Sequence, residues 1–259
     1  MIILEAKNLS KIYGQKSKGV TYQALTDLYL TIHQGEFVGI MGPSGSGKTT
    51  LLQILGTIDR PTSGEIWIEG QNVANMSDDE LADFRRKRLG FIFQEFYLLD
   101  ALTLKENILV PLVLEKRPIA EMEQRVNELA KYLGIDQVLS HRPYEVSGGQ
   151  RQRAAAARAL VHSPALILAD EPTGNLDSKS AKSLMESLVQ LNKKEQSTIL
   201  TVTHDPFTAS YCDRVIFIKD GKVFTEIRRG ESRQAFFQQI MQVTTALGGE
   251  SYELAKSRF

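Results

Sequence analysis

The sequence predicts an α/β protein built on a largely parallel sheet, and two patterns point to this fold class. Short apolar runs alternate with amphipathic segments, as strands and helices do in layered α/β domains. The apolar runs are almost continuously hydrophobic, which is typical of strands covered on both faces. We expect these buried strands at residues 37–41, 91–93, 166–169 and 198–202.

The remaining strands follow from alternation and from turn residues. Residues 2–8 and 64–69 alternate apolar and polar side chains, which predicts antiparallel strands with one solvated face. Asp220-Gly221 stands between the apolar runs 215–218 and 223–224 and therefore predicts a β-hairpin.

Helix starts are marked by capping boxes, in which a Ser or Thr precedes a Glu or Gln by three residues. Ser77 and Thr103 each begin such a box, and residues 118–133 predict a helix that ends at Gly134. Arg85-Arg86-Lys87-Arg88 lies on the helix that follows Ser77, together with several acidic residues, so we expect a solvated face rather than a nucleic-acid patch.

Composition limits the class of protein. The 31 basic and 31 acidic residues cancel, which argues against nucleic-acid binding through overall positive charge. The single cysteine, Cys212, excludes an internal disulfide and predicts an intracellular protein. The longest apolar run, at residues 108–114, is much shorter than the about 20 residues of a membrane helix. The first residues carry no signal-peptide pattern.

The predicted elements suggest a domain organisation. We expect one α/β domain at residues 1–230 with an antiparallel β subdomain, and a helical subdomain inserted at about residues 95–161. Residues 231–259 are Gln-rich and amphipathic at first, and Gly248-Gly249 and a charged end follow. We expect them to form a C-terminal extension.

A glycine-rich segment follows the first buried strand and fits G-x-x-x-x-G-K-[ST] at each fixed position. Glycines let the backbone fold around phosphate oxygens, and the helix that follows presents its positive N-terminus to the anion. Lys48 supplies a charge near the terminal phosphates, and the Thr49 hydroxyl is a ligand for Mg²⁺. By itself the motif predicts a nucleoside triphosphate site, as in GTPases, kinases and motors. The predicted phosphate-binding residues are Gly42, Ser44, Gly45, Ser46, Gly47, Lys48, Thr49 and Thr50.

Two carboxylates, Asp170 and Glu171, end the strand at 166–169. The carboxyl ends of parallel strands are where an α/β sheet places its ligand crevice. Asp170 is predicted to hold Mg²⁺, and Glu171 to orient and deprotonate an attacking water. A second carboxylate after the metal ligand favours hydrolysis over simple nucleotide binding.

A second anion site is predicted at Ser147-Gly148-Gly149-Gln150, which begins a long Arg- and Ala-rich helix. Ser147 and Gln150 form a capping box, and the two glycines leave unpaired N–H groups at the helix N-terminus. One nucleotide does not need two phosphate-binding helix ends in one chain, so we expect a head-to-tail homodimer in which each phosphate loop faces the Ser147 end of the second copy. Taken alone, the segment also fits a helix that is simply well capped.

Together these motifs resemble the ATP-binding cassette (ABC) family over about residues 1–227, and the Ser-Gly-Gly-Gln segment is similar to the family signature. The resemblance implies ATP and Mg²⁺ as ligands. It implies that Gln94 contacts Mg²⁺ and signals to the membrane partner, and that Asp177 belongs to the family's D-loop. His204 would sense the γ-phosphate, and Tyr13 would stack on the adenine.

The sequence departs from the family pattern in two segments and leaves one choice open. Val146 stands where the family usually has Leu, and Gly174-Asn175 stands where Ser-Ala is commoner. Tyr22 is an alternative to Tyr13 as the aromatic residue on the adenine.

Finer resemblances indicate the kind of transporter. Residues 56–64 and 89–99 are similar to the lipoprotein-release and macrolide-export group, and residues 203–221 and 233–249 to bacitracin-type peptide-resistance transporters. The latter implies a separate large membrane permease, a membrane sensor kinase acting through it, and a location on the cytoplasmic face of the plasma membrane. The apolar stretch 94–99 is a candidate docking groove for the permease or plain core.

A different class of function is a soluble cassette ATPase that acts in DNA repair or on ribosomes. Chromosome-type cassettes carry a long coiled coil, and this sequence has no sustained heptad run. Ribosome-acting relatives usually carry two cassettes, and this chain has one. We therefore expect a transport ATPase without a nucleic-acid partner.

Overall fold

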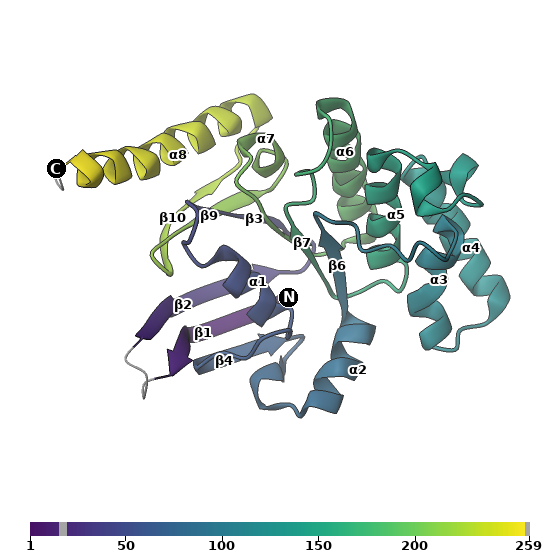
Figure 1. The fold of residues 1–259 in the computed structure, drawn as a ribbon, viewed down its shortest axis with the longest axis horizontal. Coiled ribbons are helices and arrows are strands. Elements are labelled where there is room, and N and C mark those ends of the chain that lie inside the picture. Colours follow the sequence, from purple (N-terminus) through teal and green to yellow (C-terminus); the bar gives the residue numbers. More distant parts are fainter. Residues whose placement is uncertain (16–19, 257–259) are drawn as a thin grey trace. The chain divides into compact units, whose positions relative to one another are not determined.

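The structure is a computed structural model that describes residues 1–15 and 20–256. Its residues form two compact units (Figure 1). The first unit comprises Met1–His33, Phe37–Met76 and Thr201–Phe259, and the second comprises Gln34–Glu36 and Ser77–Leu200. The segment predicted to be a helical insertion lies within the second unit.

The first unit contains an antiparallel sheet with the strand order β2-β1-β4-β5. Leu4 of β1 lies opposite both Ile32 of β2 and Ile68 of β4, and all three side chains are fully buried. The bounds are β1 (Ile2–Gln15), β2 (Val20–His33), β4 (Ser63–Ile68) and β5 (Gln71–Asn72). Alternating side chains predict β1 and β4 but not β2, because register shifts and the positive φ of Asp27 interrupt the alternation in β2.

The first unit also holds the strand that enters the phosphate loop. β3 (Phe37–Met41) is buried along its length, as predicted, and pairs in parallel with β9 (Arg214–Lys219). β9 pairs antiparallel with β10 (Lys222–Arg228), so the predicted hairpin is confirmed. α1 (Lys48–Leu55) follows the loop. α7 (Pro206–Ala209) follows the strand that ends at Val202.

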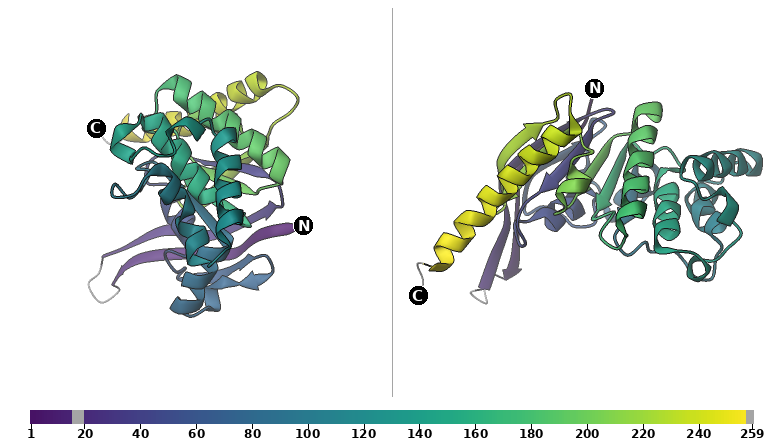
Figure 2. Two further views of the ribbon diagram at one scale, coloured as in Figure 1. Left: turned by 90° about the vertical axis from the view of Figure 1, so that its right-hand side faces the viewer. Right: turned by 90° about the horizontal axis from the view of Figure 1, so that it is seen from above.

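The C-terminal segment forms one long helix, α8 (Arg233–Lys256), as Figure 2 shows. It packs against α7 and β10 of its own unit, with Phe236, Ile240 and Leu247 buried. The glycine pair that follows the amphipathic stretch does not end the helix, which continues beyond it. Within the two described ranges of the chain, no helix is both long and apolar enough to span a membrane.

The second unit combines two strands with helices. β6 and β7 pair in parallel, with Ile92 opposite Ala169. Helix α5 contacts α3, α4 and α6, and its fully buried residues Ala154, Ala155, Ala156 and Ala157 allow this close approach. The bounds are α2 (Asp78–Arg88), β6 (Leu89–Phe93), α3 (Leu104–Leu114), α4 (Ile119–Tyr132), α5 (Gly148–Leu160), β7 (Leu166–Asp170) and α6 (Ser178–Glu195). β8 (Ile199–Val202) contributes two residues to each unit.

The capping boxes predicted from the sequence are present. Ser77 caps α2 together with Glu80, and Thr103 caps α3 together with Glu106. Each hydroxyl accepts a backbone N–H, and each carboxylate accepts the N–H of the capping residue. The boxes fix where α2 and α3 begin and therefore the course of the segments that enter them.

Candidate functional site

The phosphate loop has a backbone that requires glycine at three positions. Gly42, Gly45 and Gly47 have φ values of +154°, +79° and +99°. A Cβ atom on Gly42 would lie 2.1 Å from the carbonyl oxygen of Ile218, and one on Gly47 would lie 2.4 Å from that of Ala24. Gly45 has open space around it, so its backbone angle alone demands glycine.

The first turn of α1 has the features of an anion-binding site. Its N-cap residue is Gly47, which provides no side-chain hydrogen bond, and its first turn contains no acidic residue. The Nζ of Lys48 donates to the carbonyl oxygens of Gly42 and Pro43, at 2.9 and 2.8 Å, which folds this cation over the loop. Uncapped N–H groups beside a lysine fit the phosphates of a nucleotide.

The β9–β10 hairpin supports this loop from behind. The backbone N–H of Gly221 donates to the carbonyl oxygen of Ser46 at 3.1 Å, and the N–H of Thr26 donates to the carbonyl oxygen of Gly221 at 2.9 Å. The Tyr22 hydroxyl donates to the carbonyl oxygen of Gly45 at 2.8 Å. Asp220-Gly221 predicts the hairpin turn, but no local pattern predicts that the turn supports the phosphate loop.

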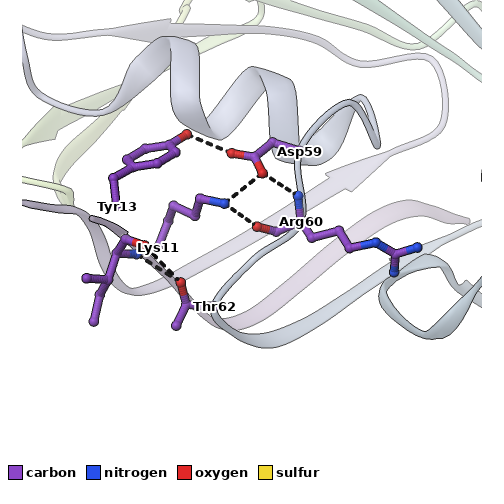
Figure 3. Close-up of polar contacts among 6 residues, drawn as sticks. Lys11, Tyr13, Asp59, Arg60 and Thr62 are labelled. Atoms are coloured by element: carbon purple, nitrogen blue, oxygen red, sulfur yellow. Dashed lines mark hydrogen bonds and ion pairs between the residues drawn. The ribbon is translucent and has the colours of Figure 1, made fainter. Parts of the chain in front are cut away.

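Tyr13 and Tyr22, the two candidates for the adenine, lie opposite each other in the β1–β2 register. The Tyr13 hydroxyl donates to Asp59 at 2.7 Å, and Lys11 donates to the same carboxylate at 2.7 Å (Figure 3). Lys11 Nζ also lies 4.7 Å from the centre of the Tyr13 ring. Partial burial, together with the bond to Asp59, raises the pKa of Tyr13. Its ring is therefore held in place before any nucleotide binds.

His204 lines a pocket in the first unit. The pocket has a volume of about 280 Å³, and its lining includes Gly42, Ser44 and His204 together with Thr244 and Leu247 of α8. A hydrogen bond of 3.1 Å from the N–H of Thr203 to the carbonyl oxygen of Ile40 holds the segment before His204 next to β3. The C-terminal helix thus reaches the residues predicted to surround the terminal phosphate.

In the second unit, Gln94 is joined to the segment that follows the acidic strand. Gln94 Nε2 donates to Asn175 Oδ1 at 3.1 Å, and Asn175 Nδ2 donates to the backbone oxygen of Gln94 at 3.2 Å. Asn175 Nδ2 also donates to Glu95 at 3.1 Å. A Cβ atom on Gly174 would lie 2.9 Å from Cδ of Gln94, which explains the glycine that departs from the family pattern.

Asp170 ends β7, and Glu171 begins the turn after it. Glu171 has a φ of +46°, an uncommon backbone conformation for a residue other than glycine. The N–H of Gly174 donates to the Glu171 carbonyl oxygen at 3.0 Å and closes the turn. Strained backbone of this kind is concentrated at functional sites, where the surrounding structure imposes it.

A buried glutamine that the sequence analysis missed links this turn to β6. Gln152 is fully buried on α5 and donates from Nε2 to the carbonyl oxygens of Pro172, at 2.6 Å, and Phe93, at 3.1 Å. These two carbonyls adjoin the segments that carry Glu171 and Gln94. The sequence predicts an Arg- and Ala-rich helix here, but no local pattern marks Gln152 or its partners.

The signature segment begins α5, as predicted. The Ser147 hydroxyl accepts the N–H of Gln150 at 3.3 Å, and the Gln150 side chain accepts the N–H of Ser147 at 2.9 Å. A Cβ atom on Gly149 would lie 2.6 Å from Ser180 Oγ on α6, whereas a Cβ atom on Gly148 would meet nothing closer than 3.8 Å. Gly149 is therefore needed for helix packing, and Gly148 is not.

Asp177 caps the N-terminus of α6. Its carboxylate accepts the N–H groups of Lys179 and Ser180, each at 3.0 Å, and the Ser180 hydroxyl at 2.7 Å. The bond from the Ser180 hydroxyl is the main cause that lowers the pKa of Asp177. The carboxylate therefore caps α6 within the single chain. The resemblance also implies that it acts in the D-loop of a dimer.

An apolar groove of about 420 Å³ lies on the second unit, and Phe91, Phe93, Val110 and Leu114 are among its lining residues. The predicted groove at residues 94–99 is not part of this lining. Instead, Arg158 donates to the carbonyl oxygens of Phe96 and Tyr97, at 2.9 and 2.5 Å, and secures that segment to α5.

The predicted site residues divide between the two units. The first unit contains Tyr13, the phosphate loop and His204, with Thr50 in α1. The second contains the carboxylates and the signature. Its predicted residues are Gln94, Ser147, Gly148, Gly149, Gln150, Asp170, Glu171 and Asp177.

Comparisons with known proteins agree with this set of motifs. The profile of the family described as "ABC transporter" matches residues 25–174. The chain is 57% identical over 258 residues to YvcR of Bacillus subtilis, an uncharacterized ABC transporter ATP-binding protein, and the match covers 100% of both chains. It is 53% identical to the bacitracin export ATP-binding protein BceA of Halalkalibacterium halodurans, over 96% of this chain and 98% of that one.

Two shorter relatives match less of the chain. LolD of Psychrobacter arcticus, a lipoprotein-releasing system ATP-binding protein, is 46% identical over 85% of this chain and 96% of its own length. The dimeric structure of the cassette MJ0796 from Methanocaldococcus jannaschii has a TM-score of 0.80 and is 42% identical, over 88% of this chain and 100% of that one. On these matches the chain belongs to the ABC transporter family as an ATP-binding subunit and is an ABC-type ATP hydrolase.

Proposed function

We propose that this chain is the ATPase subunit of a transporter that confers resistance to bacitracin-like antimicrobial peptides. The observation that carries the proposal is the extent of the matches. The match to BceA covers 96% of this chain, which is long enough to include most of α8. The match to LolD covers only 85% of this chain, although it uses 96% of the length of LolD. A match of that length leaves little room for a helix like α8, which supports the bacitracin-type group.

The ATP chemistry is assigned to residues of both units. Lys48 and the N–H groups of the phosphate loop would bind the β- and γ-phosphates, and Tyr13 would stack on the adenine. Glu171 would accept the proton of the attacking water, and His204 would contact the γ-phosphate. Ser147 and Asp177 would act on the nucleotide of a second copy in a head-to-tail homodimer.

Mg²⁺ fits the donor set of this chain. Thr49, Gln94 and Asp170 offer a hydroxyl, an amide oxygen and a carboxylate, which are the hard oxygen ligands that Mg²⁺ prefers. Within the described ranges, no group of three or more His, Cys, Asp or Glu side chains could form an all-protein metal cage. This is the usual situation for Mg²⁺ held by few side chains and by phosphates. The ion would neutralise charge on the phosphates.

A separate permease would convert ATP hydrolysis into transport, with this chain bound to it on the cytoplasmic face of the plasma membrane. The groove between β6 and α3 supports this docking because it offers exposed apolar surface beside Arg85, Arg86 and Arg158. A sensor kinase would receive the signal through the same permease.

The experiment is to purify the tagged chain from membranes in mild detergent and to identify the membrane protein that accompanies it. A permease with about ten spans, together with a gain of bacitracin sensitivity when the gene is deleted, is the expected result. The Glu171→Gln variant should fail to restore resistance, whereas the exposed-surface variant Gln190→Leu should restore it. A four-span permease and unchanged sensitivity would instead indicate lipoprotein release or macrolide export.

A further inference from the structure

A basic pocket lies on the second unit, where the end of α2 meets the turn between α3 and α4. It has a volume of about 670 Å³, and its lining includes five cationic residues. These are Arg86, Lys87, Arg88, Lys116 and Arg117.

Nearby carboxylates neutralise this charge only in part. Asp83 accepts hydrogen bonds from both Arg86 and Lys87, the latter at 2.7 Å. Glu115 accepts one from Arg117 at 2.9 Å. The Lys87 and Arg117 side chains are each 51% exposed, so their charges face solvent while they are paired. The lining of the pocket holds one carboxylate, Glu115, beside its five cations, so the formal charge of the lining is positive.

Exposed aliphatic side chains surround the same turn. Val113 and Leu114 end α3 and are 55% and 58% exposed, and Ile119 begins α4 and is 72% exposed. Lys116 and Arg117 lie between them in the sequence. An isolated exposed aliphatic residue needs no explanation, but three of them around a cationic turn form a surface that is both apolar and positively charged.

We propose that this basic turn, residues 113–119 with 86–88, binds directly to a membrane surface that contains anionic phospholipids. Cations near such a surface are attracted to the lipid phosphates, and aliphatic side chains enter the boundary between headgroups and acyl chains. The long aliphatic stems of Lys and Arg let their charged ends reach the lipid phosphates while the stems themselves contact apolar surface. Free phosphate would use the cations but would leave the aliphatic residues uncovered.

The position of Leu114 favours a membrane over an acidic protein segment. Leu114 lines both the basic pocket and the apolar groove assigned above to the permease. A chain docked through that groove would hold its basic turn next to the permease. This step rests on the proposed function, whereas the charge and the exposed aliphatic residues do not depend on it.

The test is co-sedimentation of the purified full-length chain with phosphatidylcholine vesicles, with and without phosphatidylglycerol. We expect binding only to the vesicles with phosphatidylglycerol, and weaker binding as salt is raised. The variant Lys87→Gln/Lys116→Gln/Arg117→Gln should bind at least about tenfold more weakly, because each cation near an anionic surface contributes to the attraction. Val113→Ser/Ile119→Ser should weaken binding even at high salt.

The matched control removes three cations elsewhere on the second unit, as Lys131→Gln/Lys182→Gln/Lys193→Gln, at exposed positions. It should bind like the unmodified chain, and all three variants should keep basal ATPase activity. Equal binding to both vesicle types, or equal losses in the basic-turn variant and its control, would overturn the proposal. Because no permease is present in this assay, either result leaves the proposed transport function standing.

Discussion

Gln94 and Asn175 hold each other through a reciprocal pair of hydrogen bonds, amide to amide at 3.1 Å and amide to backbone at 3.2 Å. The pair ties the residue assigned to Mg²⁺ and permease signalling to the turn that carries Glu171. A change at either residue is therefore expected to reach the hydrolytic end of the site without touching the phosphate loop.

Asn175→Ala should lower kcat by about tenfold, because Gln94 loses the partner that orients its amide, and a misplaced group costs of this order or more in rate. The affinity for ATP should change little, since the phosphate loop is intact. Steady-state ATPase kinetics and a nucleotide titration would measure the two quantities separately.

Gly174→Ala is the companion variant, because its Cβ atom would lie 2.9 Å from Cδ of Gln94 and displace the same amide. It should show the same fall in kcat with unchanged ATP affinity. Normal kcat in both variants would mean that the hydrogen-bonded pair does not position Gln94 for turnover.

Glu171→Gln should reduce turnover by about 10²–10⁴-fold, the usual contribution of a positioned general base. Because the amide keeps the size of the side chain, ATP should still bind and should accumulate in a closed homodimer. Size-exclusion chromatography with ATP would reveal the dimer. A variant that hydrolyses ATP at the unmodified rate would remove Glu171 from the catalytic role.

Gln152→Leu should destabilise the chain, because it removes the Gln152 donor from the buried carbonyl oxygen of Pro172 and one of two donors from the carbonyl oxygen of Phe93, which also accepts the N–H of Phe96. A buried acceptor left without a partner costs about 1–3 kcal/mol. Urea unfolding should show a lower midpoint, and kcat should fall because both carbonyls adjoin segments of the site. Gln190→Leu makes the same substitution at an exposed position of α6 and should leave both quantities unchanged. Equal midpoints for the two variants would contradict the role of Gln152.

Sequence patterns predicted the elements whose signals are local. The phosphate loop follows from three glycines and a lysine, and the helix starts at Ser77, Thr103 and Ser147 follow from capping boxes, because the hydrogen bonds of a cap join residues three apart. The contacts of Gln152 and of Asn175 join residues 20 and 81 positions apart, and no local pattern encodes them. Strand β2 was missed for a related reason, since pairing with β1 determines its extent despite its irregular alternation.

Gly149→Ala should cost about 1–3 kcal/mol of stability, the usual cost of forcing an extra group into a packed contact. The new Cβ atom would lie 2.6 Å from Ser180 Oγ, which also bonds to Asp177, so the cap of α6 would be disturbed as well. Gly148→Ala adds the same group with no contact closer than 3.8 Å and is the matched control. Thermal unfolding of the two variants separates them, and equal melting temperatures would show that α5 and α6 can move apart at no cost.

Leu247→Ala tests whether α8 forms part of the pocket that contains His204. Leu247 is 3% exposed and lines this pocket with Gly42 and Ser44, so truncation removes a wall of the pocket and loosens the end of the helix. The cavity left by a buried Leu costs about 2–5 kcal/mol when the surroundings do not collapse, and we expect earlier cleavage of α8 in limited proteolysis. The ATP titration should also shift, because the pocket adjoins the phosphate loop. Met241→Ala, at a 40% exposed position of the same helix, should change neither property. If Leu247→Ala behaves like Met241→Ala, the helix does not contribute to the function of the pocket.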